Sequence, residues 1–527
     1  MSPELGRRRP VRQARRCLRI GDSQDARDGM RTAWAEVDHA SIKTGWPVAL
    51  WAGLGVLLAV RLAALKLNAT DLFFDEAQYW SWSLEPAFGY YSKPPLIAWV
   101  IGAATAICGS GEFCIRLPSP LVHTATALVV FMIGRRLYST SVGLWSALGF
   151  ATLPGISLSA GIISTDMPLL LCWALALWAY IELLEREDWW PAAVLGIAIG
   201  LGLNAKYAMV FFPVSLLIHV ALTPSARRLL TDARLYVALV LGALLIAPNL
   251  MWNLANSFAT FAHTADNARW GGALLNIGKG LEFFGAQFGV FGPILFAALG
   301  WVTWQAWRTG LPQQDRLLLA FTLPVLLIIT AQGFVSRAHA NWAATAYVSG
   351  AVLVTAALMR TSRRGWLSAS LALHVLLVGL IGLATWQAGQ FRLPFGGDPF
   401  ARTLGWRALA GETRAALDEA RRQGRPFAAV ITEDRAVTAE LLYYMRDEPT
   451  PVLAWRGGGR PHDHYELTRP YDVRAPEPVL LVDLRRDASP ITQRFASVIP
   501  LGERSVAAGQ GPPRRVRLFA LSHFKPR

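Results

Sequence analysis

The chain has 527 residues, of which 53% are hydrophobic and only 17% are charged. Soluble globular domains carry about 25% charged residues, so this composition excludes an ordinary soluble protein and favours a membrane protein. Many of the arginines behind the net charge of +15 lie in the N-terminal tail and in the segments between apolar runs. Positive charge in those places orients membrane proteins, so it does not indicate nucleic-acid binding.

The N-terminal segment, residues 1–45, is rich in arginine and has no long apolar run. It is therefore not a cleavable signal peptide, and we interpret it as a disordered cytoplasmic tail. Met30 is an alternative start, because residues 1–29 resemble low-complexity upstream sequence.

Apolar stretches recur between residues 46 and 386, and each is about as long as the ~30 Å hydrocarbon core of a bilayer requires. Many of the 21 tryptophans lie at their ends, as expected of an interfacial aromatic belt. We predict an all-α polytopic domain over 46–386 with about eleven or twelve spans. The candidate spans are 46–66, 94–110, 117–134, 141–163, 165–184, 190–205, 206–222, 235–253, 283–305, 316–334, 340–359 and 366–386.

Arginines in the connecting segments predict the orientation of these spans. With the N-terminus inside, two full crossings between residues 94 and 134 would leave Arg135 outside, against the positive-inside rule. We therefore expect one net crossing there, since 94–110 opens with two prolines and is the weakest span. The outer side then holds 67–93, Asp166, Lys206, 254–282, 335–340 and the C-terminal domain.

The first outer loop, DLFFDEAQYWSWSLEPAFGYYSKPPLIAW, concentrates charged and aromatic residues. The acidic pair Asp75 and Glu76 is suited to general base catalysis at the membrane surface. Lys93 stands at the mouth of a span, where an ammonium can hold a phosphate. The simpler alternative is that Asp75 caps a helix and Lys93 reaches to the interface.

Further polar residues fall on the same outer side. Asp166, in GIISTDMPLLL, stands between two apolar runs, where an acid marks a functional site or caps a helix. Cations and aromatic residues that converge on one face indicate a site for an anionic, lipid-linked substrate. The substrate-binding candidates are Glu76, Lys93, Lys206, Tyr207, His263, Arg269, Arg337, His339 and Asn341.

Residues 387–527 change in composition and have no long apolar run. The short β-rich segments FAAVITED and PVLLVDL flank RAVTAELLYYMR, which has helical spacing, so we predict a small extracytoplasmic α/β domain. The four cysteines, Cys17, Cys108, Cys114 and Cys172, show no metal-ligand spacing, and none lies in this domain.

The chain resembles polytopic glycosyltransferases of the C-type fold, near the bacterial relatives of dolichyl-phosphate-mannose protein mannosyltransferases and of the lipid A aminoarabinose transferase. Seven segments resemble family blocks in the family's order: FDEAQYW, GYYSKPPLIAW, RLPS, STDMPL, NAKYAMV, APNLMWN and ANWAATAY. GWRALAGE and TAELLYYMRD are also similar to family sequence at the start of the extracytoplasmic domain.

This resemblance implies an inverting transferase in a bacterial inner membrane. The donor would be a sugar on a polyprenyl phosphate at the periplasmic face, and the acceptor a hydroxyl of a glycolipid, a lipopolysaccharide or a protein. Asp75 and Asp166 match the family's two acidic catalytic positions, and Lys93 matches the position expected to meet the donor phosphate. Some relatives carry an acidic residue or a histidine at the position of Ser92 or Lys93.

Several points stay open at this stage. No nucleotide-binding glycine loop and no metal cluster is evident, although a divalent cation is not excluded. A transporter or flippase of lipid-linked sugars is the alternative function, but it would predict inverted repeats and polar residues near the middle of spans. A non-catalytic scaffold would leave the ordered acidic and basic blocks without a purpose. The sequence names neither the sugar nor the acceptor.

Overall fold

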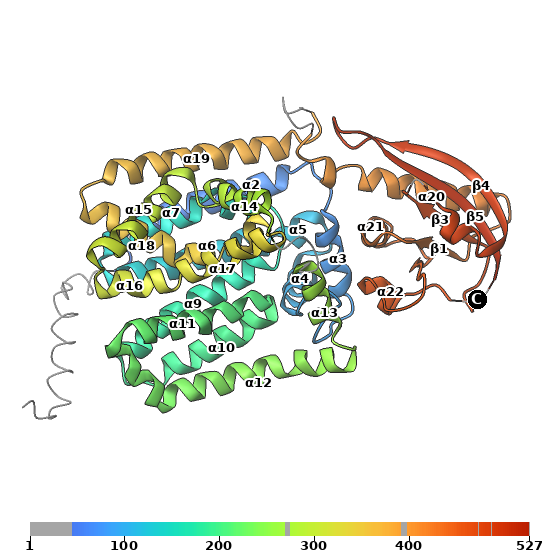
Figure 1. The fold of residues 1–527 in the computed structure, drawn as a ribbon. Coiled ribbons are helices and arrows are strands. Elements are labelled where there is room, and N and C mark those ends of the chain that lie inside the picture. The colour runs from blue at the N-terminus through green and yellow to red at the C-terminus, as the bar shows by residue number, and fades with distance from the viewer. Residues whose placement is uncertain (1–44, 269–274, 391–397, 473, 486, 526–527) are drawn as a thin grey trace, which may run out of the picture. The chain divides into compact units, whose positions relative to one another are not determined.

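The structure, a computed structural model, describes residues 45–268, 275–390, 398–472, 474–485 and 487–525. Before residue 391 the described chain is helical (Figure 1). Its α-helices are α2 (Val48–Leu67), α3 (Phe74–Ser83), α4 (Leu96–Cys108), α5 (Glu112–Arg116), α6 (Pro118–Leu137), α7 (Thr140–Thr152), α8 (Pro154–Ser159), α9 (Asp166–Glu185), α10 (Trp190–Ala205), α11 (Phe211–Leu222), α12 (Ala233–Ala255), α13 (Ala259–Ala268), α14 (Ile277–Val290), α15 (Pro293–Thr309), α16 (Gln313–Ala320), α17 (Leu323–Val335), α18 (Ala346–Arg360) and α19 (Arg364–Trp386). The predicted tail, residues 1–45, lies outside the described residues apart from Gly45.

The sequence predicted eleven or twelve spans, whereas six helical segments of the described chain, or seven if one bent pair is counted as a span, are long and apolar enough to cross a membrane. Within the described residues, four shorter apolar helices accompany them, and α14 and α15 form the pair bent by 113°. The protein is therefore a mostly helical, multi-pass membrane protein. The long segments are Val48–Leu67, Glu112–Leu137, Asp166–Glu185, Ala233–Ala255, Gln313–Val335 and Arg364–Trp386, and the short ones are Leu96–Cys108, Trp190–Ala205, Tyr207–Leu222 and Ala346–Arg360.

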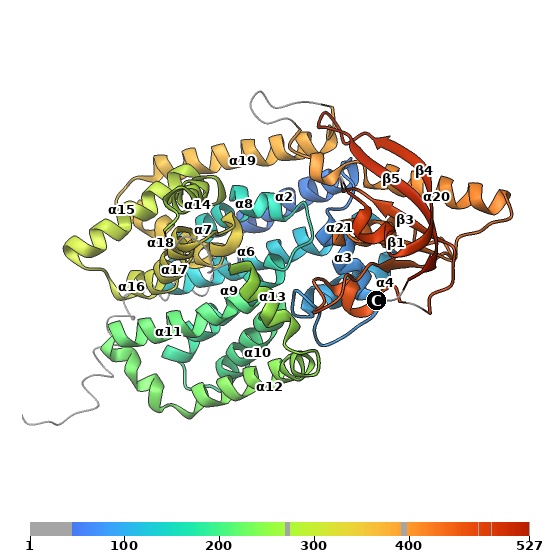
Figure 2. The ribbon, with the colours of Figure 1, turned by 45° about the vertical axis from the view of Figure 1, so that its right-hand side comes forward.

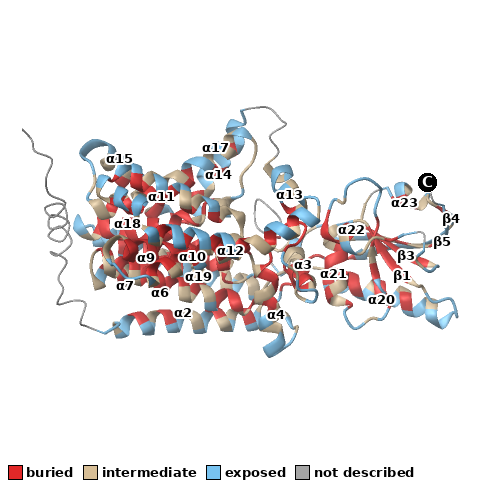
Figure 3. Cartoon of the chain, turned by 90° about the horizontal axis from the view of Figure 1, so that it is seen from below, coloured by how far each residue is buried: buried red, intermediate tan, exposed pale blue. Residues whose placement is uncertain are grey.

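Burial separates the central helices from the peripheral ones. In α9, 78% of the most apolar stretch of 18 residues is buried inside the protein, whereas only 22% of the corresponding stretch is buried in α2 and in α19 (Figure 3). The exposed faces of α2 and α19 are themselves apolar, with Trp51 and Leu376 among the exposed side chains. Apolar faces without a protein partner are the surfaces that lipid covers.

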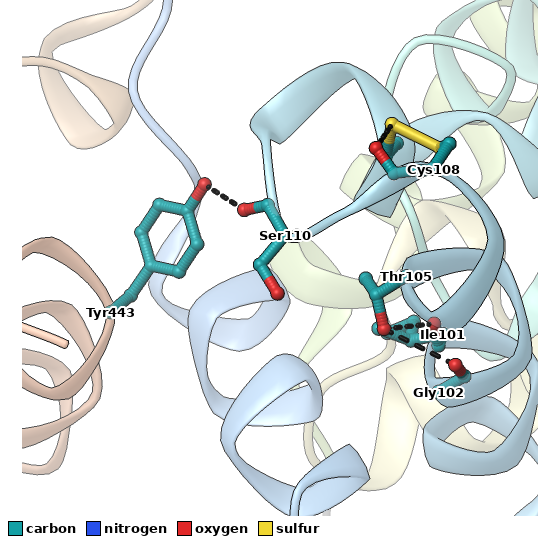
Figure 4. Close-up of a disulfide and its surroundings, with 7 residues drawn as sticks. Ile101, Gly102, Thr105, Cys108, Ser110 and Tyr443 are labelled. Atoms are coloured by element: carbon teal, nitrogen blue, oxygen red, sulfur yellow. Dashed lines mark hydrogen bonds between the residues drawn. A yellow bond between two sulfur atoms is a disulfide. The ribbon is translucent and has the colours of Figure 1, made fainter. Parts of the chain in front are cut away.

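The segment 94–134 contains one long helix rather than two. With 13 residues, α4 is about 20 Å long, which is too short for a bilayer core of ~30 Å. Its end is tied by a disulfide between Cys108 and Cys114, the only pair among the described cysteines. The carbonyl of Ser110, inside this small loop, accepts a hydrogen bond of 2.9 Å from the hydroxyl of Tyr443 (Figure 4). This geometry agrees with the single net crossing expected for 94–134.

The predicted span 283–305 is interrupted between α14 and α15. Gly292 lies there with a φ of +84°, a conformation that costs glycine little and other residues more. A Cβ at Gly292 would lie 2.1 Å from Nε2 of His374, so there is also no room for a side chain. The bend directs α14 away from α15, and the sequence pattern, which is apolar throughout, did not reveal it.

The C-terminal segment forms a five-stranded sheet with the order β2-β1-β3-β5-β4 (Figure 2). The strands β2, β1 and β3 are parallel, while β5 is antiparallel to both β3 and β4. The elements are α20 (Trp406–Arg422), β1 (Ala429–Thr432), α21 (Arg435–Tyr444), β2 (Val452–Ala454), α22 (His464–Thr468), β3 (Val479–Asp483), α23 (Ser489–Thr492), β4 (Phe495–Val506) and β5 (Arg514–Phe524). The predicted strands and helix correspond to β1, β3 and α21, whereas the β4–β5 hairpin was not predicted.

The first outer loop and the C-terminal segment share one hydrophobic core. Trp80 of α3 packs edge-on against Tyr443 of α21, with ring centroids 4.9 Å apart. Tyr465 belongs to the same buried cluster. The hydroxyl of Tyr444 also accepts a hydrogen bond of 2.9 Å from the backbone N–H of Leu72. Thus α3 is held between the membrane helices and the sheet (Figure 1).

Candidate active site

A cavity of about 610 Å³ opens between the first outer loop, the start of α9, the segment before α18 and the C-terminal segment. Nine of the eleven residues that the sequence analysis proposed for the site line this one cavity. They are Asp75, Glu76, Lys93, Asp166, Lys206, His263, Arg337, His339 and Asn341. The structure thus brings together side chains that are up to 266 positions apart in the sequence. Their chemical roles stay predictions.

Asp75 stands in the first turn of α3, where the positive end of the helix dipole favours a carboxylate. Its Oδ1 accepts a hydrogen bond of 2.9 Å from Nη1 of Arg435, which also donates to Oε1 of Gln78 at 2.8 Å. The side chains of Asp75 and Arg435 each keep 36% of their surface exposed, so a substrate can reach both. Asp75 does not cap the helix.

Glu76 supplies the cap instead, by accepting a hydrogen bond of 2.8 Å from the N–H of Phe73. Its other partners are Arg116, with 2.7 Å between Nη2 and Oε2 and 3.0 Å between Nε and Oε1, and the N–H of Ile163 at 2.9 Å. Glu76 and Arg116 are both buried. Because both carboxylate oxygens are occupied, the geometry favours a positioning role for Glu76 over the predicted substrate binding.

Asp166 joins three segments at the other wall of the cavity. It is the first residue of α9 and makes no capping hydrogen bond, so the helix-capping alternative does not describe it. Its Oδ1 accepts a hydrogen bond of 2.6 Å from Nζ of Lys206, and its Oδ2 accepts one from Nδ2 of Asn341. The side chain is buried, so this buried carboxylate fixes the direction in which Lys206 and Asn341 point.

Lys93 lines the same cavity and is close enough to Asp75 and Asp166 for both charges to act on its ammonium group. Among the described residues no carboxylate comes within 4.0 Å of its ammonium group, in contrast to Lys206. Burial, reinforced by the like charge of Lys206, lowers the pKa of Lys93 to about 8. An ammonium group that burial destabilises gains most from an anionic ligand, since the ligand restores its missing partner.

Arg337, His263 and His339 add one cation and two imidazole rings to the cavity. Arg337 donates from Nη2 to Oδ1 of Asn267 at 3.3 Å, and its Nε is buried without a hydrogen-bond partner in the described chain. Burial lowers the pKa of His263 to about 4 and also lowers that of His339. These imidazoles are therefore neutral at pH 7 and can accept a hydrogen bond.

Of the two other predicted residues, only Tyr207 lies within the described residues, and it does not line the cavity. The hydroxyl of Tyr207 donates to Oδ1 of Asn249 at 2.8 Å and accepts from Nδ2 of Asn253 at 3.2 Å. Its ring stacks on Phe261, with centroids 4.9 Å apart. Tyr207 thus supports the wall behind Lys206. Arg269 lies outside the described residues.

The C-terminal segment contributes side chains that sequence reasoning missed. They include Arg402, Arg435, His462, Asp463 and His464. One signal was available for Arg435, which follows directly after the predicted strand in FAAVITED. Ligand-binding groups gather beyond the carboxyl ends of parallel strands, and Arg435 comes just after the end of β1. Among the described residues, no three His, Cys, Asp or Glu side chains form a metal-binding group.

Comparisons with known proteins agree on one family. The model described as dolichyl-phosphate-mannose-protein mannosyltransferase matches residues 92–252. The lipid A galacturonosyltransferase RgtD of Rhizobium johnstonii is 39% identical over 77% of this chain and 84% of its own length. The lipopolysaccharide core galacturonosyltransferase RgtA of the same organism is 29% identical over 44% of this chain and 46% of its own. The crystal structure of ArnT from Cupriavidus metallidurans bound to undecaprenyl phosphate has the same fold, with a TM-score of 0.62, 15% identity and coverage of 91% of this chain and all of that one.

Proposed function

We propose a donor and an acceptor for this chain, on the premise that it belongs to the dolichyl-phosphate-mannose-protein mannosyltransferase family of polytopic glycosyltransferases, which use lipid-linked sugar donors. The proposed reaction transfers galacturonic acid from a polyprenyl phosphate to a hydroxyl group of lipid A, with inversion at the anomeric carbon. The transporter considered as the alternative is set aside, because the family is one of transferases.

One observation carries the proposal: 39% identity to a lipid A galacturonosyltransferase extends over 84% of that relative. The match covers 407 of the 527 residues, so it includes most of the cavity lining, which runs from Phe73 to His464. The two lipopolysaccharide core galacturonosyltransferases of the same organism share less: RgtA is 29% identical over 46% of its length, and a second one, RgtB, is 24% identical over 60% of its length. Lipid A is therefore the favoured acceptor.

In the proposed reaction the oxygen of the acceptor hydroxyl attacks the anomeric carbon of the donor sugar. The bond between that carbon and the phosphate oxygen breaks, and the polyprenyl phosphate leaves with the bonding electrons. The acceptor proton passes to Asp75, the carboxylate in the cavity that is exposed and faces Arg435 rather than a buried partner. A general base placed in this way contributes about 10²–10⁴-fold to a rate.

The leaving phosphate gains a negative charge as the bond breaks, so fixed cations stabilise it more in the transition state than in the ground state. Lys93, which has no carboxylate partner within 4.0 Å in the described chain, is suited to this role, and Arg337 is a second candidate. Asp166 holds Lys206 and Asn341 in place, as their hydrogen bonds indicate. We therefore assign Asp166 to positioning on the phosphate side.

The proposed site faces the periplasm of a bacterial inner membrane. Disulfides persist in oxidising compartments, and the loop closed by Cys108 and Cys114 contacts the same C-terminal segment that lines the cavity. Arg135 and Arg136 follow at the opposite end of α6, which suits a cytoplasmic position. The C-terminal residues from 387 onward would then form a periplasmic domain.

The test uses the purified full-length chain in detergent with polyprenyl-phosphate-linked galacturonic acid. Two acceptors, lipid A and a lipopolysaccharide with its core, are offered in separate reactions. We expect release of free polyprenyl phosphate together with a lipid A product heavier by one hexuronosyl residue. A product formed only on the core would contradict the acceptor, and the absence of any uronosyl transfer would contradict the donor.

A further inference from the structure

Arg435 reaches the cavity from the C-terminal segment and is held in a fixed orientation. It is the first residue of α21, and Asp434 caps that helix by accepting a hydrogen bond of 2.6 Å from the N–H of Ala436. Its guanidinium group lies over the ring of Phe74, 4.9 Å from the centroid. Helix cap and aromatic ring together restrict the side chain to one side of the cavity.

Only part of the guanidinium group is used. Nη1 donates both hydrogen bonds that Arg435 makes, to Asp75 and to Gln78. Nε and Nη2 make no hydrogen bond to any residue that the structure describes. A guanidinium presents a planar fork that matches a carboxylate with two parallel hydrogen bonds, so the unused donors offer a binding site for such a group.

The balance of charge in the cavity supports an anionic sugar. Among the described residues, five cationic side chains and four carboxylates line the cavity, and Arg116 behind Glu76 adds a sixth cation. This leaves two positive charges uncompensated. A polyprenyl-phosphate donor with a neutral sugar brings one negative charge on its phosphate, whereas a donor with a uronic acid brings a second charge on its carboxylate. The uronosyl donor neutralises the cavity.

We propose that Arg435 binds the carboxylate of the donor's uronosyl ring, an inference that rests on the proposed function. The hydrogen bond between Arg435 and Asp75 limits how far Arg435 can lie from the anomeric carbon. The base must lie beside the hydroxyl that attacks this carbon, so the guanidinium group lies about one sugar ring from the carbon. The phosphate takes the side of Lys93. Arg435 then selects uronosyl donors over neutral ones of the same stereochemistry.

This arrangement leaves the contact between Arg435 and Asp75 in place. Oδ1 of Asp75 accepts its hydrogen bond from Nη1, so a donor carboxylate can use Nε and Nη2 without displacing it. Arg435 thereby holds the uronosyl ring beside the base that deprotonates the acceptor.

The experiment compares two donors that differ only at the sixth carbon, polyprenyl-phosphate-linked galacturonic acid and polyprenyl-phosphate-linked galactose, with lipid A as acceptor. We expect the wild-type protein to prefer the uronosyl donor in kcat/KM by about 10²-fold or more. Arg435→Gln should lower kcat/KM for the uronosyl donor by about 10–100-fold and change that for galactose by less than about 3-fold. Arg435→Lys should keep part of the preference.

The matched control is Arg469→Gln. Like Arg435, Arg469 is an arginine of the C-terminal segment that pairs with a carboxylate of the first outer loop, in this case Glu85, but it lies outside the cavity. It should leave the preference unchanged. Thermal unfolding of each variant monitors folding, and Arg435→Lys decides the matter if Arg435→Gln does not fold. An equal loss with both donors, or no loss with the uronosyl donor, would overturn the assignment of Arg435. A wild-type protein that transfers neither sugar would refute the proposed function itself, and the carboxylate site with it.

Discussion

At the scale of single residues, Asp75 and Asp166 are both acidic but have different surroundings. Asp75 is partly exposed and shares one contact with Arg435, whereas Asp166 is buried and accepts hydrogen bonds from two side chains. A carboxylate that receives a proton from a substrate must be accessible to it. The structure therefore separates the two acids into a proposed base and a proposed positioning residue, although sequence reasoning treated both as catalytic.

Asp75→Asn keeps the size of the side chain and removes the base. We expect kcat to fall by about 10²–10⁴-fold, since general bases contribute that much to transfer. The control is Glu85→Gln, which removes a carboxylate of the same loop that lies outside the cavity and should transfer at the wild-type rate. Steady-state kinetics with both purified variants makes the comparison, and a wild-type rate for Asp75→Asn would show that another group takes the proton.

The lowered pKa of Lys93 predicts that the transfer rate depends on pH. Its pKa is lowered to about 8, so the ammonium is charged below that pH and neutral above it. If the charge holds the donor phosphate, kcat/KM falls as the pH rises through about 8, and the fall in kcat occurs at higher pH because bound phosphate raises the pKa again. Lys93→Arg should move the alkaline fall upward, since a guanidinium stays charged. An identical profile for both proteins would contradict the role of Lys93.

At the scale of elements, apolar pattern and turn signals predicted much of the fold. The long spans, the helix α21 and the strands β1 and β3 follow from runs whose length or alternation allows few alternatives. The β4–β5 hairpin was missed, because most of β4 is exposed and its residues Pro500 and Gly502 are poor strand formers. Within this hairpin, β5 pairs with β3, and a local sequence pattern does not reveal pairing between separate segments.

The sequence also predicted most of the candidate site, but not the part that the C-terminal segment contributes. Polar residues on one face of an apolar bundle stand out in the sequence, so most of the cavity lining was found. Arg435 and Asp463 lie in the C-terminal segment, where charged residues are common. Besides its place after a predicted strand, the contact between Arg435 and Asp75, which are 360 positions apart, distinguishes this arginine from its neighbours.

The bend between α14 and α15 gives a prediction about stability. Gly292→Ala places a methyl group 2.1 Å from Nε2 of His374 and forces a non-glycine residue to a φ of +84°. The two effects together should cost about 2–4 kcal/mol, seen as a lower Tm in detergent. Gly300→Ala in α15 is the control, because its Cβ meets nothing within 4 Å and alanine favours helices. Equal Tm values for both variants would show that Gly292 does not fix the bend.

At the scale of the whole molecule, the sidedness of the membrane is testable in cells. A reporter active only in the periplasm should be active when fused after residue 390 and silent after residue 228. Cys108 and Cys114 should resist alkylation in intact cells until a reductant is added, because they form a disulfide. The reverse reporter pattern, or free thiols at both cysteines, would place the cavity on the cytoplasmic side and contradict the periplasmic donor.

The core shared by α3 and α21 has a consequence for how the protein is made. Trp80 leaves the ribosome early, yet its packing partner Tyr443 is translated more than 360 residues later. Until then α3 lies at the membrane surface with several large aromatic side chains unburied, a state that invites capture by chaperones or proteases. A nascent chain stalled after the last membrane helix would be inserted but inactive. Completion of the cavity therefore waits until the final segment of the chain has been translated.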